Sequence, residues 1–147
     1  LKNSNLIIGN ISNTSKNFFS KYSPAPVGAV FHDFDFYSST KEALNMFSEN
    51  QDKFLPRVFN YFDDTIGNEI ELYNDFTGER LAINEFNNEN QDVKFSPAYH
   101  LICNSIVLKW HHKIWISHFF KNKNYNSFIS FEDQQSNSPK DFKFKNI

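Results

Sequence analysis

The stretch Val27-Gly-Ala-Val-Phe-His-Asp-Phe-Asp35 decides the fold that we predict for this chain of 147 residues. Its first five residues are apolar, and they follow Pro24 and Pro26, which end any preceding helix. An uninterrupted apolar run of this kind is typical of a strand that is covered on both faces, as in a parallel sheet. The run leads directly into two aspartates.

A second strand with the same kind of ending follows after a helix. Ser38-Ser-Thr40 offers N-cap side chains with Glu42 close behind, and apolar residues continue a helical face until Pro56 stops it. The run Val58-Phe-Asn-Tyr-Phe62 then leads into Asp63-Asp64. A strand, a helix and a strand form a βαβ unit, so the two strands are expected to be parallel.

Further elements are predicted on both sides of this unit. We expect a short strand at 6–8, a helix at 14–22, a second amphipathic helix at 78–87, and strands at 99–107 and 113–120. A hairpin around 109–112 would make the last two strands antiparallel. The predicted class is therefore α/β, with a βαβ unit followed by a helix and an antiparallel strand pair.

Composition excludes several classes of protein. A net charge of -2 gives no reason to expect binding to nucleic acid or to an anionic membrane. No apolar run approaches the roughly 20 residues that a membrane-spanning helix needs. The single cysteine, Cys103, excludes an internal disulfide and a cysteine-based zinc site, and a cytoplasmic location is expected. The sequence leaves a homo-oligomer open.

The four aspartates carry the predicted chemistry. Ligands in open α/β sheets bind beyond the carboxyl ends of the strands, where Asp33 and Asp35 follow one strand and Asp63 and Asp64 the next. Carboxylates this close raise one another's pKa unless a cation lies between them. Mg²⁺ or a similar divalent cation with oxygen ligands is therefore expected. A single aspartate at a strand end is commonly a cap or a turn residue, so the paired arrangement carries the argument.

The same residues resemble a known family. Ala29-Val-Phe-His-Asp-Phe-Asp-Phe-Tyr-Ser-Ser-Thr-Lys-Glu-Ala-Leu44 resembles the Asp-Gly-Asp-Leu-Tyr-Glu-Ser-Thr segment of the macrocin O-methyltransferase family. Val58-Phe-Asn-Tyr-Phe-Asp-Asp64 is similar to its second signature, and Gly78-Glu-Arg-Leu-Ala-Ile-Asn-Glu-Phe-Asn87 to the helix that follows. These enzymes depend on S-adenosylmethionine and Mg²⁺, and they methylate sugar hydroxyls of natural products.

The resemblance implies roles for individual residues. Asp33, Asp63 and Asp64 would be metal ligands, and Asp35 would be the general base that takes the proton of the acceptor hydroxyl. The implied fold is a partial Rossmann-like class I methyltransferase sheet, and the implied partner is a small-molecule acceptor such as a sugar. Phe34 stands where the family has glycine and is expected to crowd the approach to the site.

The donor-binding half of such an enzyme is missing from the predicted elements. The glycines Gly9, Gly28, Gly67 and Gly78 lie too far apart to form the glycine-rich turn that holds the cofactor. The chain also begins with Leu1. We therefore expect a fragment in which residues 1–121 are the C-terminal part of the catalytic domain and residues 122–147 are a polar, weakly structured tail. The fragment alone is not expected to bind S-adenosylmethionine.

Three alternatives remain open. A phosphatase of the haloacid dehalogenase type also has an Asp-x-Asp motif and a later Asp-Asp, although Tyr37 is unusual there and the spacing leaves no room for its other motifs. A metal-dependent glycosyltransferase could use Asp33 and Asp35, and a truncated domain could be inactive. His111 and His112 are expected to be structural or surface residues, because neighbours on a strand point to opposite faces.

Overall fold

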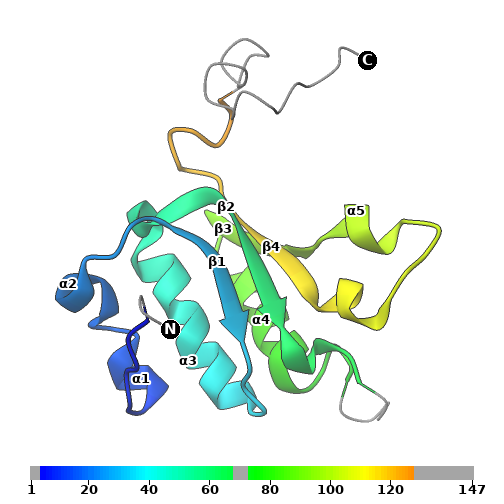
Figure 1. Ribbon diagram of the computed structural model, residues 1–147, viewed down its shortest axis with the longest axis horizontal. Coiled ribbons are helices and arrows are strands. Elements are labelled where there is room, and N and C mark those ends of the chain that lie inside the picture. The colour runs from blue at the N-terminus through cyan, green and yellow to red at the C-terminus, as the bar shows by residue number, and fades with distance from the viewer. Residues whose placement is uncertain (1–3, 68–72, 128–147) are drawn as a thin grey trace.

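The computed structural model describes residues 4–67 and 73–127, in which four strands form one mixed sheet (Figure 1). The strands are β1 (Val27–His32), β2 (Phe54–Phe62), β3 (Val93–Pro97) and β4 (Ile114–Phe119). Their order in the sheet is β1-β2-β4-β3, so β4 lies inside the sheet although it is the last of these strands along the chain. The fold is therefore α/β, as the sequence predicts.

The predicted βαβ unit is confirmed. β1 and β2 pair in parallel, with Ala29 opposite Phe59 and His32 opposite Phe62, and α3 (Tyr37–Glu49) connects them. Parallel neighbours need such a crossover, because a tight turn can join only antiparallel strands. The carboxyl ends of the two strands therefore lie side by side.

The boundaries of α3 differ from the prediction. The helix begins at Tyr37, after Phe36 in the N-cap position, and no side chain caps it. It ends at Glu49, and after η1 (Gln51–Lys53) the chain enters β2 at Phe54, so the predicted helix stop at Pro56 is wrong. Pairing with the neighbouring strands outweighs the helical spacing here. Pro56, which lacks an N–H, lies where the register of the two strands is irregular.

The antiparallel strand pair is present, but its first strand is not the predicted one. β3 occupies Val93–Pro97, and in place of a strand at 99–107 the structure has α5 (Tyr99–Ile102) and irregular chain. In place of the predicted hairpin is η3 (Lys109–Lys113), a 3₁₀ helix. β3 is only five residues long, whereas the predicted segment 99–107 is longer and contains several apolar residues. Local pattern therefore favours the wrong segment.

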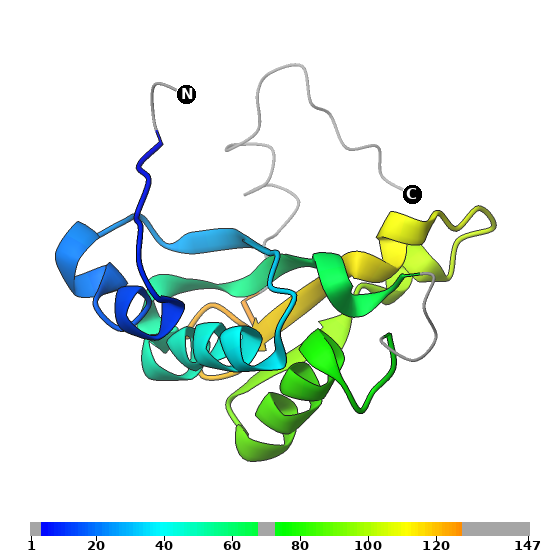
Figure 2. The ribbon, with the colours of Figure 1, turned by 90° about the horizontal axis from the view of Figure 1, so that it is seen from below.

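Helices cover one face of the sheet. Figure 2 shows α3 and α4 (Gly78–Glu89) side by side on that face, and each contributes buried residues at the same helical spacing. These residues are Thr40, Ala43, Leu44 and Phe47 in α3, and Glu79, Ala82, Ile83 and Phe86 in α4. They pack against stacked rings from the strands, with ring centroids 4.7 Å apart for Phe47 and Phe54 and 4.8 Å apart for Phe54 and Phe119.

The opposite face of the sheet is less covered than the sequence predicts. Within the described residues no helix lies over β1 and β2 on that side (Figure 2). Phe31 of β1 is 80% exposed there, and its neighbour Phe59 of β2 is 53% exposed. The expectation that the first strand is covered on both faces is therefore wrong for the described part of the chain. An apolar run shows that a strand prefers burial, but it does not show what buries it.

The segment before β1 also differs from the prediction. Residues 6–8 form no strand, and two short helices, α1 (Ile11–Thr14) and α2 (Phe18–Tyr22), take the place of one helix at 14–22. Asn10 begins the first of them, because its side chain accepts the backbone N–H of Ser12 at 2.9 Å. Ser23, with a φ of 43°, ends the second.

Part of the predicted tail lies outside the described residues, which end at 127. Its described beginning packs against the strands, because the Arg57 guanidinium lies 4.2 Å from the ring centroid of Tyr125 and the Tyr125 hydroxyl lies 2.9 Å from Nδ1 of His118. Across residues 4–67 and 73–127, no helix combines the length and the apolar character that crossing a membrane would require.

Candidate functional site

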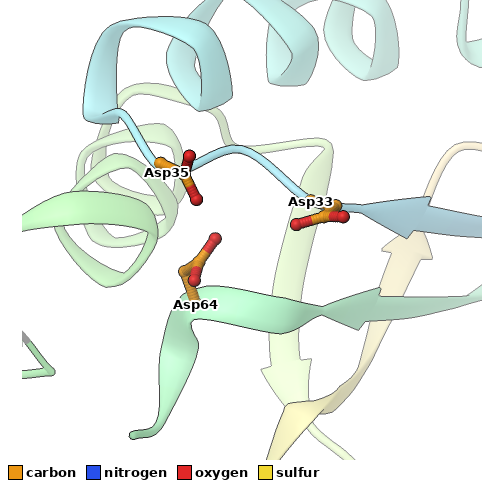
Figure 3. A group of neighbouring side chains, drawn as sticks. All are labelled: Asp33, Asp35 and Asp64. Atoms are coloured by element: carbon orange, nitrogen blue, oxygen red, sulfur yellow. The ribbon is translucent and has the colours of Figure 1, made fainter.

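Three carboxyl groups meet at the carboxyl ends of β1 and β2 (Figure 3). Asp33 directly follows β1, Asp35 lies in the loop before α3, and Asp64 lies in η2 (Asp63–Thr65), the 3₁₀ turn after β2. One carboxylate oxygen of each lies within 4.8 Å of those of the other two, and Figure 3 shows all three side chains pointing into a common space. We call these three residues the acidic cluster.

Positive charge opposes the acidic cluster weakly, because the charge of Lys113 lowers the pKa of Asp64 but is the smallest of the causes that shift it. Among the described residues, no lysine or arginine forms an ion pair with any of its three members. Burial raises the pKa of Asp64, and the charges of Asp35, Asp63 and Asp33 raise it further. Three converging carboxylate oxygens match the donor set that a hard divalent cation prefers. The residues present therefore fit such a cation.

The predicted ligand Asp63 points elsewhere. Its Oδ1 accepts hydrogen bonds from Nζ of Lys113 and from the Tyr61 hydroxyl, each at 2.8 Å. These two bonds, first that of Lys113, lower the pKa of Asp63. The structure therefore brings together two of the three predicted ligands and the predicted base, but not Asp63.

The contact between Lys113 and Asp63 differs from what the sequence predicts about the charges near the four aspartates. From the sequence, Lys41 and Arg57 are the nearest cations and the four aspartates lack compensation. In the structure, the Lys113 side chain, only 15% exposed, reaches Asp63 from 50 residues further along the chain. That prediction is wrong because β4, which follows Lys113, pairs directly with β2. No local pattern in the sequence indicates this contact.

A buried acid lies beside the acidic cluster. Glu79, in the first turn of α4, is 0% exposed, and its Oε2 accepts the backbone N–H of Asp64 at 2.8 Å. Burial raises the pKa of Glu79 to about 8; the Asp64 N–H lowers it, and the charges of Asp64, Asp63 and Asp33 raise it. The sequence does indicate that Glu79 is buried, because helical spacing places it on the same face as Ala82, Ile83 and Phe86.

A pocket of about 310 Å³ opens beside the acidic cluster. Its lining comes from the start of α3, from η2 and from the chain that leads into α4: Asp35, Phe36, Tyr37, Asp64, Tyr73, Thr77 and Gly78. Two of the three clustered aspartates thus face a space that could hold a small molecule, flanked by aromatic rings. Asp33 does not line it.

Phe34 does not crowd this pocket, in contrast to the expectation. Its ring lies 6.2 Å from that of His32 and lines a separate, mostly apolar groove that α1 and α2 border. Since successive side chains of extended chain point in opposite directions, Phe34 turns away when Asp33 and Asp35 turn inward. The loop therefore accommodates a large residue at this position.

The histidines are outside the acidic cluster. His32 is 2% exposed, stacks on Phe62 and has a pKa that burial lowers to about 4, which the hydrogen bond with Asn60 opposes. His111 is buried in η3, where its Nδ1 accepts the backbone N–H of Leu108 at 3.1 Å, whereas His112 is exposed. The structure therefore agrees with structural and surface roles for these residues.

Comparison of the chain with protein-family models, with curated proteins and with solved structures gave no match in any of the three. The features of the chain that bear on its function are therefore the acidic cluster, the pocket and the sheet.

Proposed function

We propose that this chain carries the metal- and acceptor-binding part of an O-methyltransferase, which transfers a methyl group from S-adenosylmethionine to a hydroxyl of a small molecule such as a sugar. The observation that carries the proposal is the convergence of Asp33, Asp35 and Asp64 beside a pocket, without a lysine or arginine paired to them in the described part of the chain. The two segments that resemble the macrocin O-methyltransferase family, 29–44 and 58–64, contain these three side chains together with Asp63.

The geometry suggests a division of roles. Asp33 and Asp64 approach the common space from two neighbouring strand ends, so they are the proposed cation ligands. Asp35 is exposed and lines the pocket, so it can accept the proton of an acceptor hydroxyl. A bound divalent cation would hold the acceptor oxygen and lower the pKa of its hydroxyl. The ligand role of Asp63 stays a prediction, since Lys113 holds its carboxylate.

The sheet supports the same proposal. β4 is antiparallel to β2 and β3 and lies between them, so β3 runs in the same direction as β1 and β2. This mixed sheet is compatible with the α/β fold that the resemblance implies. In addition, α1, α3 and α4 lie on one side of the sheet, which is compatible with half of a two-sided fold (Figure 2).

The described residues do not supply the glycine-rich turn that the resemblance implies for the methyl donor. Gly9 precedes α1, Gly28 lies within β1, Gly67 follows η2 and Gly78 begins α4, so no strand is followed by a glycine-rich turn. We propose that the elements binding the donor are supplied from outside these 147 residues. No step through the donor is therefore assigned to a residue here.

Two measurements test the proposal. Isothermal titration of Mg²⁺ or Mn²⁺ into the chain tests the cation site without any donor. Transfer of a labelled methyl group from S-adenosylmethionine to a panel of sugar hydroxyls tests the reaction, in a polypeptide that includes the residues preceding this segment. We expect Asp33→Asn to abolish both signals. Asp52→Asn is the matched control, because Asp52 is exposed, pairs with Lys53 and lies before the start of β2.

Three outcomes would contradict the proposal in different ways. Full methyl transfer in excess EDTA would exclude the metal role. Phosphate release from a phosphomonoester, without methyl transfer, would favour the phosphatase interpretation. Micromolar binding of S-adenosylmethionine by the chain alone would show that the donor site lies within these residues.

A further inference from the structure

Glu79 is an acid on the buried face of α4, where the other buried residues are apolar. The buried positions of this helix are Glu79, Ala82, Ile83 and Phe86. Acidic side chains are almost never fully buried unless something binds them, because a charge or an unpaired carboxyl is costly away from water. Packing alone therefore does not explain a glutamate here.

Its contacts lead to the acidic cluster. Oε2 of Glu79 accepts the backbone N–H of Asp64 at 2.8 Å. Oε1 of Glu79 and Oδ2 of Asp64 are both buried, and neither has a hydrogen-bond partner in the described residues. The two residues are thus linked directly, and each keeps a buried oxygen available to a further group.

The linked N–H belongs to η2, where other hydrogen bonds hold the side chains of Asp63 and Thr65, whereas Glu79 binds the backbone N–H of Asp64. η2 begins after Phe62 without a side-chain cap, and Asp64 departs from helical geometry with φ and ψ of -102° and 20°. The first N–H groups of a helical turn have no partner within the turn, and the oxygen of a carboxyl group can accept a hydrogen bond from them. Glu79 supplies that acceptor from another element, and it thereby connects η2 to the beginning of α4.

The backbone at the start of α4 directs Glu79 into the interior of the molecule. Gly78 has a φ of 55°, a left-handed conformation that side-chain-bearing residues rarely adopt, and no atom lies within 4 Å of the place where its Cβ would be. The chain turns there from the extended Thr77 into the helix, so residue 79 enters the interior in the first turn.

We propose that Glu79 is a positioning residue of the cation site: its bond to the backbone N–H of Asp64 fixes η2 so that the Asp64 carboxylate faces Asp33 and Asp35. This inference rests on the cation site of the proposed function, but it does not depend on methyl transfer. The carboxylate of Asp64 is placed through the backbone, so the cation affinity of the cluster responds to a residue that does not contact the cation.

The test compares Glu79→Gln, which keeps an acceptor oxygen, with Glu79→Met, which has a similar volume and no comparable acceptor. Three quantities are measured for each: the Kd for Mn²⁺ by isothermal titration, hydrogen exchange of the Asp64 amide, and the denaturant midpoint. We expect Glu79→Met to weaken Mn²⁺ binding by about tenfold or more and to expose the Asp64 amide to exchange. Glu79→Gln should retain both within about twofold, and Glu85→Gln, on the same helix but bound to Lys41 and Tyr37, should change neither.

The results separate this inference from the proposed function. If the wild-type chain binds Mn²⁺, two results for Glu79→Met would overturn the positioning role: a Kd equal to that of the wild type, or an unchanged exchange rate of the Asp64 amide. Either result would leave the cation site itself valid. Equal losses in the Gln and Met variants would show that the charge of Glu79, and not its acceptor oxygen, matters. Absence of Mn²⁺ binding by the wild-type chain would overturn the cation site and the positioning role together.

Discussion

Asp63 and Asp64 follow one another at the end of β2 and face different parts of the molecule. Asp63 is neutralised by Lys113 and hydrogen-bonded by Tyr61, and its pKa is lowered. Asp64 faces two further carboxylates, has Glu79 behind its backbone, and its pKa is raised, first by burial. Two identical neighbouring residues thus have opposite electrostatic surroundings. The difference shows that residues far away in the sequence decide the electrostatic surroundings of each aspartate.

The largest expected effect comes from the acid behind Asp64. The pKa of Glu79 rises from its ordinary value of 4.5 to about 8 on folding, with burial as the first cause. Between these values the folded chain holds a proton that the unfolded chain has lost, so the free energy of unfolding falls as the pH rises. The slope approaches about 1.4 kcal/mol for each pH unit.

Urea unfolding from pH 5 to 8.5, without divalent cations, measures this slope. Glu79→Gln should remove it, and the contribution of His32 cancels in the difference because both chains contain that residue. A Glu79→Gln profile parallel to that of the wild type would show that Glu79 is not the titrating group.

The second effect is the direct contrast between the two aspartates. Asp64→Asn removes an unpaired carboxylate from the acidic cluster, so we expect Mg²⁺ affinity to fall by about 100-fold, or roughly 2.7 kcal/mol. Asp63→Asn removes a carboxylate that Lys113 already compensates, so the loss should stay below about tenfold. Both Kd values are obtained by titration at the same ionic strength. Equal losses of Mg²⁺ affinity in the two variants would contradict the expected difference between the aspartates, since they would mean that Asp63 leaves Lys113 to bind the cation.

The smallest effect concerns Lys113. Lys113→Met frees Asp63 and adds one net negative charge near the acidic cluster, so Mg²⁺ should bind a few-fold more tightly, and less so at high salt. Lys121→Met, which breaks the exposed pair with Asp92, is the matched control and should leave the Kd unchanged. A weaker Mg²⁺ affinity in Lys113→Met would mean that the ion pair shapes the site.

Local pattern was sufficient for one half of this molecule and insufficient for the other. The βαβ unit and α4 are predictable because their apolar residues follow the period of each element and the aspartates follow the strand runs directly. β3 is too short to give a strong period. The partner of Asp63 depends on the pairing of β2 with β4, which is a long-range property. Glu79 is an intermediate case, since its place on the apolar face is readable but its bond to Asp64 is not.

The position of β4 inside the sheet has a consequence for how the chain acquires its structure during synthesis. β1, α3 and β2 leave the ribosome early and can pair at once, whereas β3 pairs only with β4, which is made about 20 residues later. Until β4 has been made, β3 has no strand to pair with in the described part of the chain, and Asp63 lacks its lysine. The second half of the sheet and the ion pair beside the acidic cluster can therefore form only late in synthesis.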